Sequence, residues 1–294
     1  MITGMGAVSP YGQGWQTYWQ GLKSGRSAVR RISLFNPEQL PSQVAGEVPD
    51  FDPQSVVGAK EARRLSRVLA MGIGSAREAA ADAGLDIRSW EGERQEEIGV
   101  VVGCSTGGID VLEREFGHYY RGETTKYSPF AVTSSMVGAL SSEIAIDLKC
   151  KGPCHVVSTG CTSATDAIGM AYQLVRYGRV RRVITGGADA IITPSIVLSY
   201  ALMKCISTGF NGTPERASRP FNSDRDGFVL AEGAWTFVLE RLEDALERGA
   251  TIHREIMGYG ATCDAFHRVQ IAPDGVESSR AMTSALADAG MSTY

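Results

Sequence analysis

Cys161 has the sequence setting of a catalytic nucleophile. A short β-branched strand that includes His155 breaks at Gly160, and a helix of small residues is expected to begin on the cysteine itself. The first backbone N–H groups of a helix have no intrahelical partner and carry the positive end of the helix dipole. They therefore favour a thiolate and can hold the oxygen of a thioester under attack. The alternative is that Cys161 is a buried apolar filler, the usual fate of a free cysteine.

Other candidate groups carry weaker signals. With no paired C-x-x-C spacing and only four histidines, no metal site is expected. The run Gly103–Gly108 lacks the lysine of a phosphate-binding loop. Asp226 and Glu232 are expected to brace loops rather than to form an acid–base pair. The remaining cysteines lack a strand-turn-helix setting and are expected to fill core or surface positions: Cys104, Cys150, Cys154, Cys205 and Cys263.

Composition limits the class of protein. The chain has 294 residues, 43% of them hydrophobic, which is enough for one large domain or two modest ones. Its formal net charge of −4 gives no basic excess, so nucleic acid is not an expected partner. Because the sequence has neither a signal-peptide pattern nor an apolar run of roughly 20 residues, we expect a soluble, cytoplasmic protein without a membrane span.

Apolar runs alternate with helical patterns along the chain. Short runs predict strands buried on both faces at Ile98–Gly103, Val180–Gly187 and Ala234–Glu240. Helices are expected at Trp15–Leu22, Lys60–Gly84, Val132–Leu148, Thr162–Tyr177, Pro194–Cys205 and Leu242–Arg248. Such alternation is typical of layered proteins of the α/β class.

The chain is expected to divide at Gly249-Ala250. Residues 1–249 would form one unit and residues 250–294 the beginning of another, with a strand at Ile252–Gly258 and a helix at Val276–Ala289. A strand, a loop and a helix without a further strand make half a unit. We therefore expect the second unit to be truncated.

Several stretches together resemble the β-ketoacyl-acyl-carrier-protein synthases of fatty-acid and type II polyketide synthesis. The resemblance implies the thiolase-like layered αβαβα fold, with the N-terminal half complete and the C-terminal half only begun. It runs in order from residue 2 to the end of the chain. The matching stretches are Ile2-Thr3-Gly4-Met5-Gly6-Ala7-Val8-Ser9-Pro10, Ser158-Thr159-Gly160-Cys161-Thr162-Ser163, Gly186-Gly187-Ala188-Asp189, Ser218-Arg219-Pro220-Phe221, the run from Asp224 to Ala234, and Asp264-Ala265-Phe266-His267.

The resemblance implies that Cys161 accepts an acyl group as a thioester. The substrate arrives on the phosphopantetheine arm of an acyl carrier protein, and no separate cofactor is implied. In the family two histidines and a lysine serve the decarboxylative condensation with a malonyl unit. They lie in Asn-Ala-His-Gly-Thr and Lys-x-x-x-Gly-His motifs, and neither motif occurs in these 294 residues. The chain is thus expected to carry the acyl-accepting part of the reaction.

Further roles also follow from the resemblance. Thr106, Tyr200 and Phe228 match positions that line the acyl pocket, and His267 belongs to a loop beside the active-site entrance rather than to the catalytic histidines. All four residues are expected to contact the substrate. Cations expected to face the acidic carrier protein are Lys60, Arg63, Arg64, Lys126 and Lys204, although a solvated helix face would explain them equally well. A dimer is implied, either of identical chains or with a ketosynthase-like chain-length subunit.

Two other readings remain open at this point. The chain could be a non-catalytic or defective ketosynthase-like partner, although such partners usually replace the cysteine that is present here at position 161. It could also be a thiolase-like enzyme that uses coenzyme A directly. The Asp264–His267 loop and the run from Asp224 to Ala234 favour the carrier-protein group.

Overall fold

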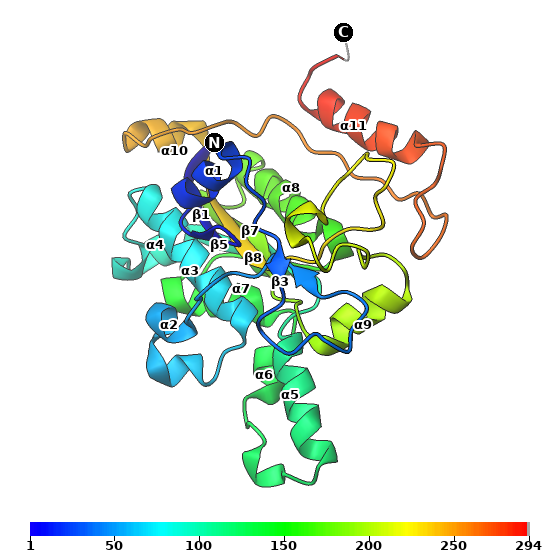
Figure 1. Cartoon of the computed structure of the whole chain (residues 1–294). Coiled ribbons are helices and arrows are strands. Elements are labelled where there is room, and N and C mark those ends of the chain that lie inside the picture. The colour runs from blue at the N-terminus through cyan, green and yellow to red at the C-terminus, as the bar shows by residue number, and fades with distance from the viewer. Residues whose placement is uncertain (293–294) are drawn as a thin grey trace.

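The computed structural model describes residues 1–292 and is built around one mixed β-sheet (Figure 1). The strand order is β2-β1-β8-β7-β5-β6, in which β5 runs parallel to β6 and β7 while β8 runs antiparallel to β1 and β7. Its strands are β1 Ile2–Ser9, β2 Gly12–Gln13, β5 Ile98–Gly103, β6 Cys154–Val157, β7 Arg182–Asp189 and β8 Gly233–Glu240, and a separate ribbon pairs β3 Arg30–Arg31 with β4 Val44–Ala45.

Helices flank the sheet. The α-helices are α1 Trp15–Lys23, α2 Pro53–Ala62, α3 Arg67–Asp82, α4 Glu93–Glu96, α5 Ile109–Tyr120, α6 Ala131–Ser135, α7 Ala139–Leu148, α8 Ser163–Arg176, α9 Pro194–Leu202, α10 Leu242–Glu247 and α11 Val276–Asp288. Short 3₁₀ turns occur at Ile87–Ser89, Thr124–Lys126, Gly160–Thr162 and Pro214–Arg216. Within residues 1–292 the helices are too short or too polar to cross a membrane.

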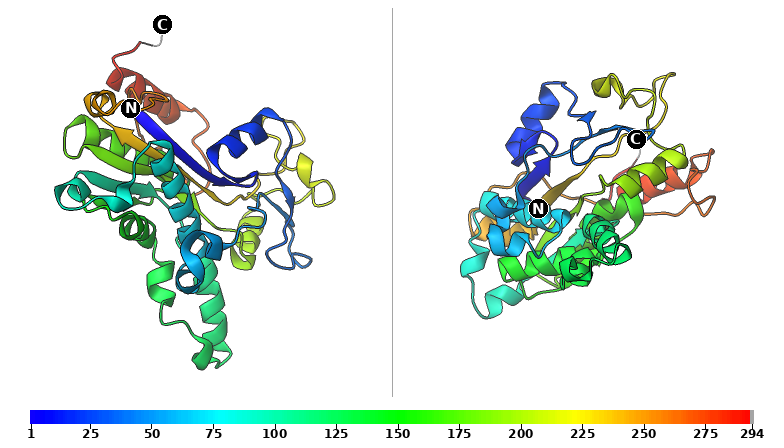
Figure 2. Two further views of the ribbon diagram at one scale, coloured as in Figure 1. Left: turned by 90° about the vertical axis from the view of Figure 1, so that its left-hand side faces the viewer. Right: turned by 60° about the horizontal axis from the view of Figure 1, so that its bottom comes forward.

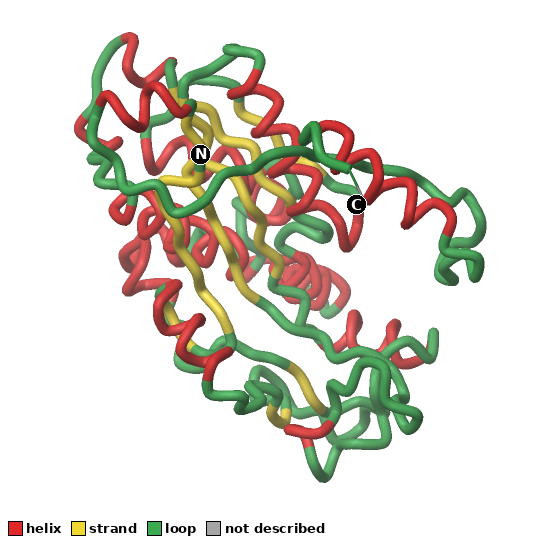
Figure 3. Tube along the Cα trace, turned by 90° about the horizontal axis from the view of Figure 1, so that it is seen from above, coloured by secondary structure: helices red, strands yellow, loops and turns green. Residues whose placement is uncertain are grey.

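The sheet has a hydrophobic core on each of its faces. Along β5 the side chains alternate: Val100 and Val102 join the core under α3 and α7, whereas Val101 joins the core under α8. This explains why the strand is apolar throughout, since a strand covered on both faces has no polar side. Figure 3 shows the strands lying between the two sets of helices, so the expected α/β class with buried strands is confirmed.

Two parts extend from this layered body. The segment of α5 and α6 projects downwards in Figure 1 and in the left view of Figure 2. The chain after α10 crosses the molecule in an extended path and ends in α11, which lies on the side of α8.

Three expectations about elements were wrong. The helix expected at Lys60–Gly84 is divided into α2 and α3 around Ser66, which starts α3 with an extended ψ of 164°. This turn directs α3 into the core. The helix expected at Val132–Leu148 is likewise divided between Ser135 and Ala139, where the Ser135 carbonyl accepts a hydrogen bond from the Gly108 N–H at 3.2 Å. Tertiary packing therefore overrides helical periodicity at both places.

The third wrong expectation is the strand at Ile252–Gly258. The segment meets the sheet only near Arg254, whose carbonyl accepts the Ile2 N–H at 2.7 Å, while the His253 N–H donates to the Ile2 carbonyl at 2.9 Å. A strand needs a partner along its whole length. Here the chain leaves the edge of β1 after one bridge and turns towards α8 and α11 instead.

Candidate active site

A cavity opens where the parallel strands end. The carboxyl ends of β5, β6 and β7 meet at one edge of the sheet, next to the beginning of β8, and the segments that follow them enclose about 520 Å³. Ligands of open α/β sheets bind in this crevice. Four residues singled out from the sequence line the cavity together: Cys161, Thr106, Tyr200 and Phe228.

Cys161 lies on the turn between β6 and α8. Gly160 adopts a left-handed φ of 68°, a 3₁₀ turn spans Gly160–Thr162, and the α-helix begins at Ser163 rather than on the cysteine. The Ser163 hydroxyl closes the turn by donating to the Gly160 carbonyl at 2.6 Å and accepting the Thr159 N–H at 3.0 Å. Cys161 is exposed and faces the cavity, so it is not a buried filler.

Glycines let the start of α8 approach the sheet. A Cβ atom on Gly103, at the end of β5, would stand 2.3 Å from the Ala164 nitrogen, and one on Gly187 in β7 would stand 2.7 Å from the Ala164 Cβ. Both distances are shorter than real Cβ contacts. The two glycines therefore set the depth at which the cysteine turn sits in the cavity.

Asp189, at the end of β7, holds the loop that follows β5. Its carboxylate accepts hydrogen bonds from the Ser105 N–H at 3.1 Å and from the Thr106 N–H and hydroxyl at 3.2 Å. Burial, followed by the charge of Asp189, raises the pKa of the Cys104 thiol to about 12, so that thiol stays protonated and is no rival nucleophile. We predicted no role for Asp189, although its position after two glycines at a strand end was a usable signal.

Tyr200 and Phe228 form the aromatic part of the cavity wall. Their rings meet edge to face, with centroids 5.6 Å apart and an interplanar angle of 76°. Burial, and next the negative charge of a Cys161 thiolate, raises the pKa of Tyr200. The phenol is therefore neutral at physiological pH and offers a hydroxyl to the cavity.

His267 lies outside this cavity. It is exposed in the loop before α11, and its Nδ1 accepts hydrogen bonds from the Val269 and Gln270 N–H groups at 3.1 Å each. Among residues 1–292 no histidine lines the cavity around Cys161. The described residues thus place no histidine beside Cys161 in this cavity, and the entrance role of His267 stays a prediction.

The two carboxylates expected to brace loops do so. Asp226 accepts the N–H groups of Thr208 and Gly209 at 2.9 and 2.7 Å. Glu232 is buried, pairs with Arg67 at 2.7 Å and accepts the Val48 N–H at 2.9 Å.

The expected docking cations come from separate elements. Lys60, Arg63 and Arg64 lie at the end of α2, Lys126 lies in the 3₁₀ turn after α5, and Lys204 follows α9. Arg64 pairs with Glu61 at 3.2 Å, and Lys126 pairs with Glu123 at 3.0 Å. The Arg64 guanidinium also lies 5.0 Å from the Phe130 ring, which brings α2 next to α6.

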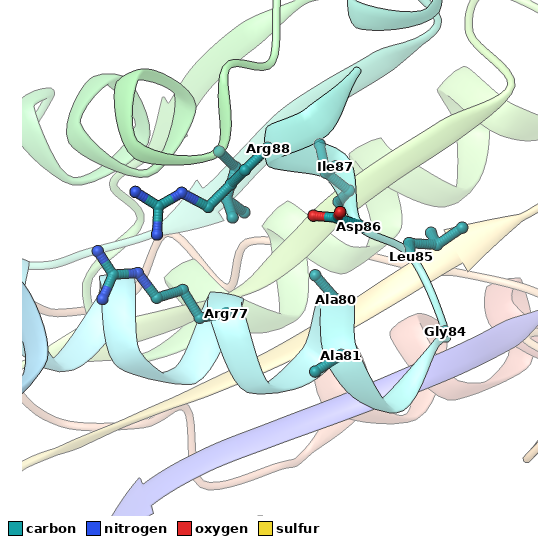
Figure 4. A pocket seen from close by; sticks show the side chains of 9 residues that line it. Arg77, Ala80, Ala81, Gly84, Leu85, Asp86, Ile87 and Arg88 are labelled. Carbon is teal, nitrogen blue, oxygen red and sulfur yellow. The ribbon is translucent and has the colours of Figure 1, made fainter.

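A second cavity of about 460 Å³ lies at the end of α3 (Figure 4). Arg77 and Arg88 border it, but the Arg77 guanidinium is engaged by the Asp147 carboxylate at 2.8 and 2.6 Å. It contains no nucleophile and shares no residue with the cavity around Cys161. In the described part of the chain, no group of three or more histidine, cysteine or acidic side chains could hold a metal ion.

The fold and this site together define a layered α/β protein with an exposed cysteine on the turn that precedes a helix. The sequence profile of the β-ketoacyl synthase N-terminal domain matches residues 1–245. The 3-oxoacyl-[acyl-carrier-protein] synthase 2 of Synechocystis sp. is 38% identical over 291 residues, which cover 99% of this chain and 69% of that relative. The chain belongs to the β-ketoacyl synthase family.

Solved structures agree with the fold. A β-ketoacyl synthase from Burkholderia phymatum matches with a TM-score of 0.88 and 33% identity, and the ishigamide ketosynthase/chain length factor matches with 0.87 and 32%. A type II polyketide ketosynthase in complex with its acyl-carrier protein matches with 0.86 and 26%. These alignments cover 99% of this chain and 69–70% of the matched chains.

Proposed function

We propose that this protein is an acyltransferase that accepts an acyl group on Cys161 from an acyl carrier protein and extends it by decarboxylative Claisen condensation with malonyl-acyl carrier protein. The observation that carries the proposal is the exposed cysteine on its strand-turn-helix, facing a cavity with an aromatic wall. The names of the relatives support a role in fatty-acid or polyketide synthesis.

The acyl-accepting step uses groups of this chain. The Cys161 thiolate attacks the thioester carbonyl carbon, and the backbone N–H of Cys161, at the start of a helical turn, stabilises the oxyanion. When the intermediate collapses, the bond to the phosphopantetheine sulfur breaks, and the departing thiolate takes up the proton that Cys161 lost on ionisation. Cys161 then carries the acyl chain, which lies along Tyr200 and Phe228. No resident cofactor takes part in this proposed step.

The condensation step forms one C–C bond and breaks the C–S bond to the cysteine. Loss of carbon dioxide from the malonyl thioester gives a carbanion that attacks the acyl carbonyl on Cys161, and the C–S bond to the cysteine breaks to release the Cys161 thiolate. The groups that the family uses for this step lie in motifs that the printed sequence does not contain. The proposal for residues 1–294 alone is therefore acyl loading.

Mass spectrometry of the protein after incubation with an acyl-acyl carrier protein tests acyl loading. We expect one acyl group on the peptide that contains Cys161, none in Cys161→Ala, and full loading in Cys154→Ala, which removes another exposed cysteine. An acyl group that survives Cys161→Ala would contradict the proposal. Loading from acyl-coenzyme A but not from the carrier protein would favour the thiolase-like alternative, and no loading from either would favour a non-catalytic partner.

We also propose a cytoplasmic protein that acts as a dimer, of identical chains or with a chain-length subunit. Support for an assembly comes from the projecting α5–α6 segment, where large apolar side chains are exposed: Phe116, Tyr119, Tyr120, Val132 and Met136. Exposed Lys60, Arg63 and Lys204 support docking of an acidic carrier protein. Light scattering with and without a chain-length subunit, and the salt dependence of loading, test these two points.

A further inference from the structure

The carboxylate of Asp166 contacts both sides of the turn that carries Cys161. Asp166 lies in the first turn of α8, and its Oδ2 accepts the hydroxyls of Thr159 and Thr162, the latter at 3.0 Å. Thr159 precedes the cysteine by two residues, and Thr162 directly follows it. One oxygen atom therefore joins the two ends of the turn.

Tyr259 holds the other oxygen of the same carboxylate. Its hydroxyl donates to Asp166 Oδ1 at 2.5 Å, although Tyr259 lies in the segment that follows α10. A Cβ atom on Gly169 would be 2.5 Å from the tyrosine ring, so the ring lies directly against α8. The Tyr259 N–H donates to Asp288 at 3.0 Å, and Arg176 of α8 pairs with Asp288 at 2.7 Å. The tyrosine is thus fixed at its ring, its backbone and its hydroxyl.

Protonation fixes the direction of these hydrogen bonds. Burial would raise the pKa of Asp166, but the hydroxyl donors Thr159, Tyr259 and Thr162 lower it below its usual value. Burial and then the hydrogen bond to Asp166 raise the pKa of Tyr259 to about 12. At neutral pH the carboxylate therefore accepts from three hydroxyls, and hydrogen bonds to a charged acceptor are the stronger kind.

We propose that Asp166 and Tyr259 are positioning residues that hold the Cys161 turn in the orientation required for attack on the acyl thioester. Neither side chain lines the cavity around Cys161, so they act through the backbone of the turn. The Cys161 thiol is free and exposed. Its position is therefore set by the conformation of the residues that flank it. The part of this inference that concerns the acyl thioester rests on the proposed function.

The alkylation rate of Cys161 by iodoacetamide, measured peptide by peptide, tests the positioning without any acyl substrate. Tyr259→Phe removes only the hydroxyl, and Thr162→Val removes only the donor beside the cysteine, so both variants keep the charge of Asp166. Each is expected to slow alkylation of Cys161 roughly threefold to tenfold, the loss of one net hydrogen bond. Cys154, exposed on β6, serves as the internal reference in every sample.

Two comparisons separate positioning from general stability. Tyr172→Phe removes a different tyrosine hydroxyl, which lies on α8. This hydroxyl donates to the carbonyl of Met257, in the same segment as Tyr259, at 3.0 Å and does not contact the Cys161 turn. The variant is expected to leave alkylation of Cys161 unchanged. Thr162→Ser restores a hydroxyl and is expected to recover the wild-type rate. Because both donors act through one carboxylate, Tyr259→Phe combined with Thr162→Val is expected to slow alkylation by less than the product of the single effects.

Wild-type alkylation rates in Tyr259→Phe and Thr162→Val would overturn the inference, as would faster rates or an equal loss in Tyr172→Phe. If Tyr259→Phe does not fold, the pair Thr162→Val and Thr162→Ser decides alone. Acyl loading measured in the same variants keeps the two proposals apart. If wild type is not loaded from any acyl thioester, the proposed function fails, while the alkylation rates still show whether the turn is held in place.

Discussion

Replacement of Gly103 by alanine tests how closely the sheet must approach the start of α8, directly after Cys161. The added Cβ would stand 2.3 Å from the Ala164 nitrogen, 2.3 Å from the Ser163 carbonyl carbon and 2.4 Å from its oxygen. All three atoms belong to backbone, which cannot rotate away as a side chain can. To restore an ordinary contact of 3.4 Å, the start of α8 must retreat by about 1 Å from β5.

Two energies oppose each other in Gly103→Ala. Overpacking in a core costs typically about 1–3 kcal/mol, and contact with three backbone atoms favours the upper end. Alanine gains about 0.4–1 kcal/mol by restricting the unfolded chain. The net loss is about 2 kcal/mol, which for a protein of this size lowers the melting temperature by roughly 4–8 °C.

The assay is thermal unfolding followed by circular dichroism, combined with the alkylation rate of Cys161. Gly138→Ala is the matched control, because Gly138 has a φ of −61° and its added Cβ would meet only Val156, at 3.9 Å. We expect this control to melt within about 2 °C of wild type. If Gly103→Ala melts as the control does and alkylates at the wild-type rate, the close approach of sheet and helix does not position the cysteine.

Two further predictions concern buried charge and pH. Glu240 is fully buried and accepts hydrogen bonds from Arg182 at 2.7 Å and Thr3 at 2.5 Å. Glu240→Gln is expected to lower the free energy of unfolding in urea by about 3 kcal/mol because the buried Arg182 loses its nearest carboxylate, whereas exposed Glu243→Gln should change it by under about 0.5 kcal/mol. Tyr259 has a pKa of about 12 in the folded protein, above the ordinary value of about 10. Its contribution is present below pH ~10 and lost as pH rises towards ~12, so the stability advantage over Tyr259→Phe, about 1 kcal/mol at pH ~9, should shrink at higher pH. An advantage independent of pH would refute this assignment.

The sequence was most informative where local pattern and tertiary environment agree. The run Ile98–Gly103 is apolar at every position because the sheet is covered on both faces, and it forms β5 with the expected bounds. The strand, glycine and cysteine likewise predicted a thiol next to a helix start, and Cys161 lies on the 3₁₀ turn directly before α8. Both features depend on residues that are neighbours in the chain.

The features that sequence reasoning missed depend on distant neighbours. The breaks around Ser66 and before Ala139 are set by other segments that pack at those points. The strand expected at Ile252–Gly258 has suitable residues but meets β1 at only one bridge, between Arg254 and Ile2. The hydrogen bond from Tyr259 to Asp166 joins residues 93 positions apart, and no local pattern indicates such a pair.

That hydrogen bond also bears on how the chain is divided. The family profile ends at residue 245, and the expected end of the helix Leu242–Arg248 at Gly249 predicted a boundary at Gly249-Ala250. Yet the segment beyond this boundary reaches back to α8, where Tyr259 binds the carboxylate that joins both ends of the Cys161 turn. The segment beyond the sequence boundary is therefore linked through Asp166 to the residues that flank Cys161. The strands and glycines of the first 249 residues determine where Cys161 lies, and Tyr259, beyond them, donates a hydrogen bond to the carboxylate that joins both ends of its turn.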